Sequence, residues 1–141
     1  MPTTGPESRA IVAVGIATDS AGRLLVGQRP PGKDYAGQWE FPGGKLEPGE
    51  TVYQALVREF GEELNLTVLA AHPLFSSRQA YPDRSVELHL WHVTRYHGEM
   101  RGLEGQVLRW VSVGDLDSLD FLEGNRSLLK RVCALTISDC Q

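Results

Sequence analysis

Apolar and polar residues alternate in several short stretches of this chain, which is the pattern of half-buried β-strands. The alternation is clear in Ile11–Ala17 and again in Leu24–Val26, and the turn-forming residues 19–22 (DSAG) lie between these two stretches. The first two strands are therefore predicted to form a β-hairpin. Further strands are predicted at 67–71, 74–79, 86–95 and 107–113.

The apolar residues of 52–60 recur at intervals of three and four, as they do on the buried face of an amphipathic helix. Thr51 followed by Gln54 fits a capping box at the start of this helix. Asn65 suits the left-handed conformation that ends many helices. We therefore predict a helix over about 51–64.

Three other segments complete the predicted layout. The Pro- and Gly-rich residues 29–38 (RPPGKDYAGQ) are expected to form a loop, and residues 81–84 (YPDR) a turn between strands. Apolar residues at helical spacing between 128 and 135 predict a C-terminal helix over about 125–137. Strands around a central helix, closed by a second helix, indicate an α/β sandwich with a mixed β-sheet.

The length of 141 residues suits a single domain, which we place at 9–141 after a flexible tail at 1–8. The chain is 41% apolar and 23% charged, as in ordinary soluble proteins. The tail lacks the basic start and apolar centre of a secretion signal, and Cys133 and Cys140 show neither metal-ligand spacing nor a disulfide pattern. These features predict a cytoplasmic protein with reduced thiols.

The formal net charge of −4 argues against binding to a nucleic-acid polymer, which favours a basic surface. The longest apolar runs, such as Ala10–Ala17, are far too short to cross a bilayer. We therefore expect no nucleic-acid polymer and no membrane among the partners. A small anionic substrate is compatible with this charge if a metal ion accompanies it.

The predicted helix over 51–64 ends in a cluster of acidic side chains. Glu59, Glu62 and Glu63 occupy about one turn at the end of the helix, where the helix dipole favours cations. Glu59 and Glu63 also project into the apolar sector, and like charges four residues apart repel each other. A hard divalent cation such as Mg²⁺ resolves these conflicts, because it takes oxygen ligands from carboxylates and from substrate phosphate. The cluster therefore predicts a metal site.

The acidic turn belongs to a longer spaced pattern, which is Gly44, five residues, Glu50, seven residues, Arg58-Glu59-Phe60, one residue and Glu62-Glu63. This pattern resembles the Nudix box, G-x5-E-x7-R-E-U-x-E-E-x-G-U, in which U is a bulky apolar residue. The sequence departs from it at Phe60, a mild change in bulk, and at Asn65, which replaces the last glycine. Asparagine tolerates the left-handed helix cap, so no chemical role is affected.

The resemblance to the MutT-type branch of the Nudix family extends over about residues 9–137. Residues 12–16 (VAVGI) are similar to its first strand, and 39–45 (WEFPGGK) to its approach to the box. Residues 81–84 (YPDR) and 104–106 (EGQ) are similar to two further loops. The resemblance implies a Nudix-type α/β/α sandwich in which the acidic helix is the catalytic helix.

The resemblance also implies a reaction. Proteins of the MutT-type branch hydrolyse a nucleoside triphosphate to the monophosphate and pyrophosphate with Mg²⁺, or with Mn²⁺ in its place. Their favoured substrate is 8-oxo-dGTP, an oxidised purine nucleotide. The implied cellular role is to sanitise the nucleotide pool and so prevent mutation during DNA replication, alongside DNA repair. We expect a monomer.

The family's acidic residues carry over one by one. The resemblance assigns catalysis to Arg58, Glu59, Glu62 and Glu63, and metal binding to Gly44, Glu59, Glu62, Glu63 and Glu104. Among these, Glu59 is the first candidate for the base or for the group that positions water. Arg58 is expected to pair with a glutamate of the helix and fix its rotamer. Glu50 and Glu40 are expected to support the site, although Glu50 also suits charge compensation at the start of a helix.

The remaining candidates concern the nucleotide. Arg29 resembles the family's phosphate-contacting arginine, since a guanidinium group suits phosphate oxygens. Asn125, Phe41 and Arg84 are the candidates for contact with the base. The carboxamide of Asn125 offers one acceptor and one donor, which match N7–H and O6 of 8-oxoguanine. Asn125 equally suits a helix N-cap, and Phe41 equally suits the core.

Two other functions stay open from the sequence. A pyrimidine-directed enzyme acting on CTP or a modified dCTP shares the box and differs in the base pocket. A catalytically inactive nucleotide-binding domain is the alternative of another class. The presence of all the acidic residues disfavours that second alternative.

Overall fold

In the computed structural model of this protein, residues 9–81 and 84–139 are described, apart from the side chains of 9, 81, 84 and 136–139. The strands are β1 (Arg9–Ala17), β2 (Leu24–Gln28), β3 (Trp39–Glu40), β4 (Gly43–Lys45), β5 (Thr67–Tyr81), β6 (Arg84–His97) and β7 (Val107–Val111). The helices are α1 (Val52–Leu64), the 3₁₀ helix η2 (Val113–Ser118), α2 (Glu123–Arg126) and α3 (Leu129–Asp139). The tail at 1–8 and residues 82–83 of the predicted turn lie outside this description.

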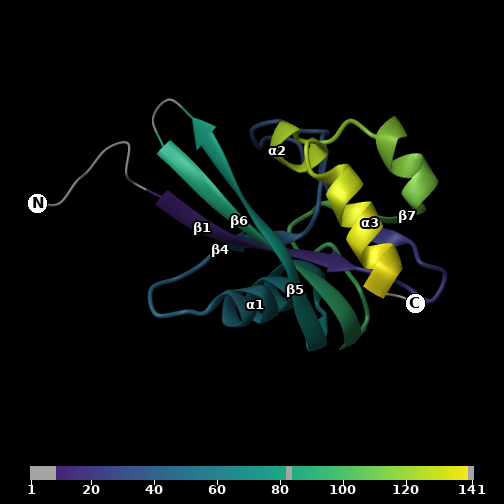
Figure 1. Ribbon diagram of the computed structural model, residues 1–141. Coiled ribbons are helices and arrows are strands. Elements are labelled where there is room, and N and C mark those ends of the chain that lie inside the picture. Colours follow the sequence, from purple (N-terminus) through teal and green to yellow (C-terminus); the bar gives the residue numbers. More distant parts are fainter. Residues whose placement is uncertain (1–8, 82–83, 140–141) are drawn as a thin grey trace, which may run out of the picture.

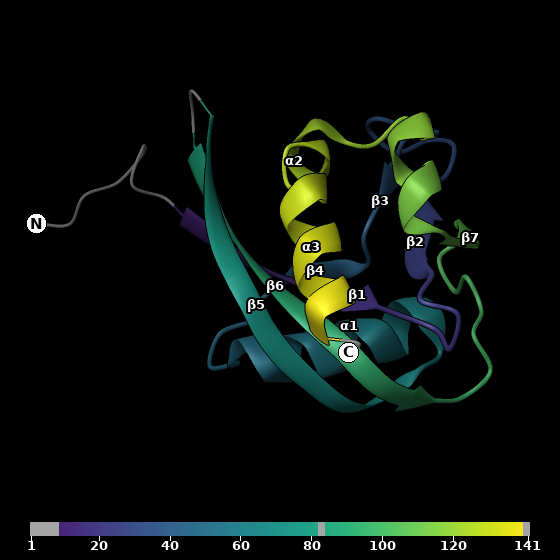
Figure 2. The same ribbon diagram turned by 45° about the vertical axis from the view of Figure 1, so that its right-hand side comes forward.

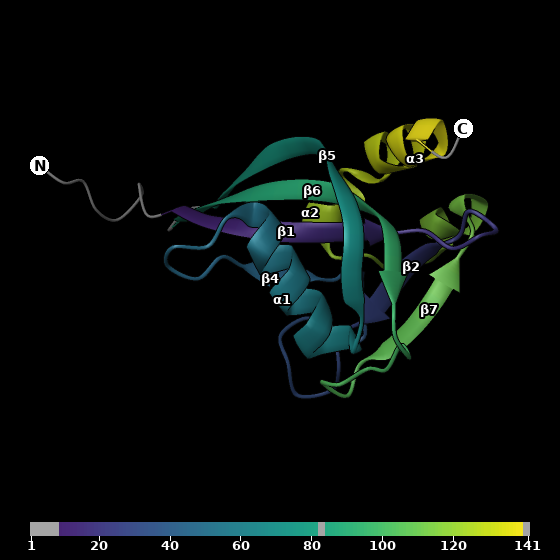
Figure 3. The ribbon, with the colours of Figure 1, turned by 90° about the horizontal axis from the view of Figure 1, so that it is seen from below.

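The strands form a four-stranded sheet in the order β4-β1-β6-β5 and a three-stranded sheet in the order β3-β2-β7. Strand β1 pairs in parallel with β6 and antiparallel with β4, so the larger sheet is mixed. Figure 1 shows helix α1 below this sheet, and Figures 2 and 3 show that α3 lies on the other side of it. The predicted α/β/α sandwich is therefore confirmed.

Strand β1 supplies both cores of the sandwich, because successive side chains of a strand point to opposite faces. Ala13 packs on one face with Phe60 of α1. Val14 packs on the other face with Val132 of α3. Gly15 lies under the ring of Phe60, which would collide with a Cβ atom at this position. The glycine thus lets α1 approach the sheet closely, and it accommodates the bulk of Phe60.

Helix α1 begins and ends as predicted. The Thr51 side chain accepts the N–H of Gln54 at 3.1 Å, and the Gln54 side chain accepts the N–H of Thr51 at 2.9 Å. Asn65 takes the left-handed conformation at the C-cap, with φ of 62°. Local contacts therefore hold both ends of the acidic helix.

The predicted hairpin between the first two strands is wrong. Residues 19–22 do turn the chain, and the Asp19 carboxylate accepts the N–H of Arg23 at 2.8 Å. Beyond one bridge between Thr18 and Leu24, however, β1 and β2 belong to different sheets. Both edges of β1 are taken by β4 and β6, which are distant pairings that local alternation does not reveal.

The strands predicted at 67–71 and 74–79 are one continuous strand, β5. The prediction left residues 72–73 outside both strands, and Pro73 itself cannot donate to a ladder. Strand β5 lies at the edge of its sheet, and its register with β6 shifts between Pro73 and Phe75. The missing N–H of Pro73 therefore falls where the ladder is already irregular.

The C-terminal part of the chain also differs from the prediction. The strand predicted at 107–113 ends at Val111 and is followed by η2, while β6 is longer than the predicted 86–95. The helix predicted over 125–137 is divided into α2 and α3. The division lets Asn125 bond the backbone of Phe41 while α3 packs against the core. No helix in the described parts of the chain is long and apolar enough to span a bilayer.

Candidate functional site

The double glycine of β4 lies directly against the end of α1. A Cβ atom at Gly44 would collide with the carboxylate of Glu59, and one at Gly43 would collide with the carbonyl oxygen of Ala13. Only glycine therefore permits this approach of helix, strand and neighbouring strand. The Glu59 side chain is 15% exposed, so its carboxylate is largely enclosed between α1 and β4.

Arg58 uses all of its N–H groups in hydrogen bonds to the residues around it. Its Nε and one Nη2 hydrogen form a two-point pair with Glu50, at 2.7 and 2.9 Å. Its Nη1 donates to Glu59 at 2.9 Å and to Glu62 at 3.3 Å. The second Nη2 hydrogen is donated to the carbonyl oxygen of Lys45 at 3.0 Å. This confirms the expected pairing of Arg58 and links the start of α1, its last turns and β4 through one side chain.

The pair between Arg58 and Glu50 stays ionised over the whole physiological range. Hydrogen bonds from Arg58 and from the backbone N–H of Glu47 lower the pKa of Glu50 to about 2. The same bond to Glu50 raises the pKa of Arg58. The contact with Arg58 is what one of the two suggested roles of Glu50 requires.

The loop after β6 closes the end of α1. The carbonyl oxygen of Glu63 accepts the N–H of Leu103 at 3.0 Å and the side-chain Nε2 of Gln106 at 3.1 Å. The Oε1 of Gln106 accepts the N–H of Glu104 at 2.9 Å. Carbonyl groups at the end of a helix need such donors. By supplying them, this loop places Glu104 beside Glu63, and Gln106 is the brace that sequence reasoning did not identify.

Glu63 has the most strongly shifted pKa among the acidic residues of the site. Partial burial, a hydrogen bond with Glu59 and the charges of Glu59, Glu104 and Glu40 raise the pKa of Glu63 to about 10. Without a counter-charge, the carboxyl group therefore keeps its proton at neutral pH. Neighbouring carboxylates that share a site in this way favour a bound cation.

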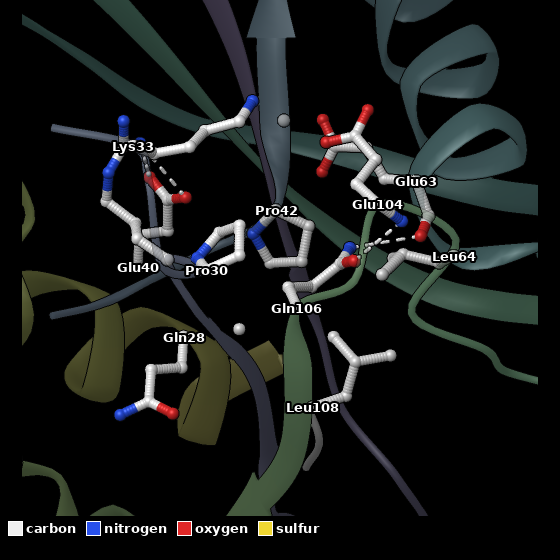
Figure 4. A pocket seen from close by; sticks show the side chains of 13 residues that line it. Gln28, Pro30, Lys33, Glu40, Pro42, Glu63, Leu64, Glu104, Gln106 and Leu108 are labelled. Atoms are coloured by element: carbon white, nitrogen blue, oxygen red, sulfur yellow. Dashed lines mark hydrogen bonds and ion pairs between the residues drawn. The ribbon is translucent and has the colours of Figure 1, made fainter. Parts of the chain in front are cut away.

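Glu63 and Glu104 form one wall of a polar cavity of about 220 Å³, which we call the carboxylate cavity. Figure 4 shows their carboxyl groups side by side, with the amino group of Lys33 on the opposite side. Its other lining residues include Arg29, Glu40, Gly43 and Gln106. Gly44, Glu59 and Glu62 are not among the lining residues, and the side chain of Glu62 is 57% exposed. The structure therefore brings Glu63 and Glu104 together and leaves Glu62 on the outer side, bonded to Arg58.

Arg29 is held largely by its own loop. Its Nε donates to the carbonyl oxygen of Asp34 at 2.6 Å, and its Nη1 donates to Glu40 at 3.3 Å. Burial raises the pKa of Glu40, and the charge of Arg29 opposes that rise. Among the described contacts only Nη2 of Arg29 carries no hydrogen bond, so the group it offers to a ligand is smaller than the sequence suggested.

A second cavity of about 590 Å³ adjoins the first and shares Arg29, Glu40 and Gly43 with it. We call it the aromatic cavity, because Phe41 and Phe121 line it with their ring centroids 5.4 Å apart. Its volume lies within the range of small-molecule sites. Arg29, Glu40 and Gly43 thus lie between a cavity with a charged lining and a cavity with an aromatic lining.

Asn125 lies at the aromatic cavity, where its Oδ1 accepts the backbone N–H of Phe41 at 2.9 Å. Its alternative role as a helix N-cap is wrong, because α2 begins after Leu122 and Asn125 is inside the helix. Phe41 is 4% exposed, so it belongs to the core and lines the cavity at once. The side chain of Arg84 lies outside the described residues.

The residues of the carboxylate cavity fit a hard divalent cation. Every acidic donor there is a carboxylate oxygen, and Glu63 needs a positive charge to ionise. Within the described part of the chain, no three acidic, histidine or cysteine side chains already stand together as a metal site. Arg58 holds Glu59 and Glu62 by hydrogen bonds.

Known proteins resemble this chain in sequence and in fold. A NUDIX domain profile matches residues 8–132. The CTP pyrophosphohydrolase of Escherichia coli K12 is 40% identical over 104 residues, covering 74% of this chain and 77% of that protein. The 8-oxo-dGTP diphosphatase of E. coli K12 is 36% identical over 121 residues, covering 86% of this chain and 94% of that protein. The solution structure of the E. coli ORF135 protein superposes with a TM-score of 0.83 and 35% identity, covering 94% of each chain.

The raised pKa of Glu63 predicts how the stability of the metal-free protein depends on pH. Between the ordinary value of 4.5 and about 10, the folded protein keeps a proton that the unfolded chain releases. The free energy of unfolding should therefore fall as pH rises through this window. Glu63→Gln mimics the protonated carboxyl group, so it should remove this part of the slope and be the more stable protein at alkaline pH.

Urea unfolding in the presence of EDTA, from weakly acidic to alkaline pH, measures this slope for both proteins. Glu123→Gln is a matched control, because Glu123 lies on α2 and outside the carboxylate cavity. Parallel pH profiles for the wild type and Glu63→Gln would show that Glu63 titrates normally.

Proposed function

Because this chain belongs to the Nudix family, we propose that it hydrolyses a nucleoside triphosphate to the monophosphate and pyrophosphate with the help of a divalent cation. Mg²⁺ is the proposed ion, with Mn²⁺ as a substitute, because an oxygen-only carboxylate site suits hard cations. The preferred substrate in this proposal is 8-oxo-dGTP.

The observation that carries the proposal is the junction of the two cavities at Arg29, Glu40 and Gly43. A nucleotide has a charged end and an aromatic end, and the two cavities that share these residues offer a charged lining and an aromatic lining. The aromatic cavity receives the base between apolar side chains and the amide of Asn125. The triphosphate then extends into the carboxylate cavity, where Glu63 and Glu104 stand.

Each acidic residue has a distinct task in this proposal. Glu59, Glu63 and Glu104, with the carbonyl of Gly44, would hold a divalent cation, which would supply stabilisation of phosphoryl charge and activation of water. Arg58 donates to Oε2 of Glu59 at 2.9 Å, and Glu59 also shares a hydrogen bond with Glu63 that a bound cation would replace. Glu62 contributes from the outer side through Arg58.

The preference for an oxidised purine rests on Asn125. Its Oδ1 accepts one bond from Phe41, which fixes the orientation of the amide group. A carbonyl oxygen has two lone pairs, so Oδ1 can also accept N7–H of 8-oxoguanine while Nδ2 donates to O6. Unoxidised guanine has a lone pair at N7 and leaves that acceptor unmatched. The similarity to the 8-oxo-dGTP diphosphatase of E. coli supports the same substrate.

A second candidate is hydrolysis of CTP or a modified dCTP. It is favoured by the 40% identity to the CTP pyrophosphohydrolase of E. coli. In either case the protein acts as a cytoplasmic monomer in the proposal. Removal of 8-oxo-dGTP would sanitise the nucleotide pool before DNA replication.

A nucleotide panel tests the reaction and the substrate together. Pyrophosphate release from 8-oxo-dGTP, dGTP, CTP and 5-methyl-dCTP should depend on Mg²⁺, stop with EDTA and give the highest kcat/KM for 8-oxo-dGTP. Glu63→Gln should lower kcat by about 10²-fold or more, the scale of single groups that stabilise transition-state charge. A maximum on a cytidine nucleotide would select the second candidate, and nucleotide binding without release would indicate an inactive binding domain.

Substitution of Asn125 tests the base contact separately. Asn125→Ala should reduce the preference for 8-oxo-dGTP over dGTP by about 5- to 150-fold, the range for an unmatched buried hydrogen-bonding group. It should also lower the melting temperature, because the N–H of Phe41 loses its partner. Asn125→Asp restores an acceptor for that N–H but not the donor to O6. It should therefore recover stability without recovering kcat/KM on 8-oxo-dGTP, whereas a purely structural Asn125 would leave the preference unchanged in both variants.

A further inference from the structure

The loop between β2 and β3 is tied in place through Arg29. The N–H of Arg29 donates to the carbonyl oxygen of Gln38 at 2.8 Å, and its own carbonyl accepts the N–H of Gly37 at 2.9 Å. Its guanidinium Nε donates to the carbonyl oxygen of Asp34 at 2.6 Å. These bonds close the loop on itself, so its side chains are carried on a defined backbone.

Lys33 ends a tight turn inside this loop. Its N–H donates to the carbonyl oxygen of Pro30 at 3.3 Å, and Gly32 has φ of +91°. Pro31 followed by a glycine at positive φ is the signature of a type II turn. The turn sets Lys33 among the residues that line the carboxylate cavity.

The amino group of Lys33 faces Glu63 and Glu104 across this cavity (Figure 4). It donates no hydrogen bond to any residue that the structure describes. The nearby Glu40 carboxylate, which feels its charge, is bonded to Arg29 instead. Lys33 therefore offers three N–H donors and a full positive charge to the cavity.

The position of Lys33 relative to the two cavities selects the part of a nucleotide that it can reach. Arg29 lines both cavities and marks their junction, whereas Lys33 lines the carboxylate cavity alone. A nucleotide whose base fills the aromatic cavity passes Arg29 first. The groups farthest from the base then lie between Lys33 and the acidic wall.

We propose that Lys33 binds the β- and γ-phosphates of the triphosphate, and so selects triphosphates over monophosphates. The proposal rests on the proposed function for the identity of the substrate. Lysine suits this task because its ammonium group is a compact point charge that accepts many phosphate geometries. The divalent cation neutralises the phosphates from the acidic wall, and Lys33 neutralises them from the opposite wall.

The test compares Lys33→Met, Lys33→Arg and the control Lys130→Met, which removes an exposed lysine from α3. Calorimetry with Mg²⁺ measures binding of inorganic pyrophosphate and of 8-oxo-dGMP to each protein. Lys33→Met should weaken pyrophosphate binding about tenfold or more, the effect of losing one hydrogen bond to a charged group. Binding of the monophosphate should stay unchanged, and Lys33→Arg should keep most of the pyrophosphate affinity.

In steady-state assays Lys33→Met should raise KM for the triphosphate more than it lowers kcat. Equal weakening of both ligands, no weakening of either, or a wild type that does not bind pyrophosphate would overturn the role of Lys33. If the wild type binds pyrophosphate but hydrolyses no triphosphate, the proposed function fails. The calorimetric comparison then still decides whether Lys33 binds phosphates.

Discussion

Carboxylates that repel one another must be held together before this site can exist, and Arg58 is the group that holds them. Its guanidinium is anchored by two bonds to Glu50 at the start of α1 and reaches Glu59 and Glu62 in the last turns. Glu50 is thereby kept ionised, and its charge is balanced within the pair. The positive charge of Arg58 is therefore shared among Glu50, Glu59 and Glu62, and no described hydrogen bond or ion pair joins it to Glu63. The carboxyl group of Glu63, which has no positive partner of this kind among the described residues, is therefore what favours a metal ion at the site.

The fold converts this charge arrangement into a shaped cavity. Gly44 lets β4 lie against the carboxylate of Glu59, where any side chain would collide with it. The carbonyl at the end of α1 is satisfied by the same loop that carries Glu104, through Gln106. The same hydrogen bonds therefore close the end of α1 and position Glu104. On the opposite wall, Arg29 closes the loop that presents Lys33, so both walls are held by hydrogen bonds in which the backbone takes part.

Part of this site could be predicted from the sequence, because it depends on interactions between residues that are close together in the chain. The capping box at Thr51 and the spacing of the apolar residues fixed the helix, and therefore placed Glu59 and Glu63 on its inner sector. The partners of β1 were not readable, because they come from distant segments and the nearby turn suggested a hairpin. The role of Lys33 could not be predicted from the sequence either. Lys33 lies in a loop with no periodicity, and only the folded structure shows that it lines the carboxylate cavity. Its Pro-Gly turn could be recognised in the sequence, but its direction could not.

We infer that metal-free Glu63 holds a proton that a divalent cation displaces. Calorimetric titration with Mn²⁺ at neutral pH, repeated in buffers of different ionisation enthalpy, counts the protons released per bound ion. The account predicts release of about one proton in the wild type, since metal binding to a protonated ligand must expel its proton. Saturable Mn²⁺ binding without proton release would contradict it, because the carboxylates would then already be ionised and their repulsion would not be what the cation relieves.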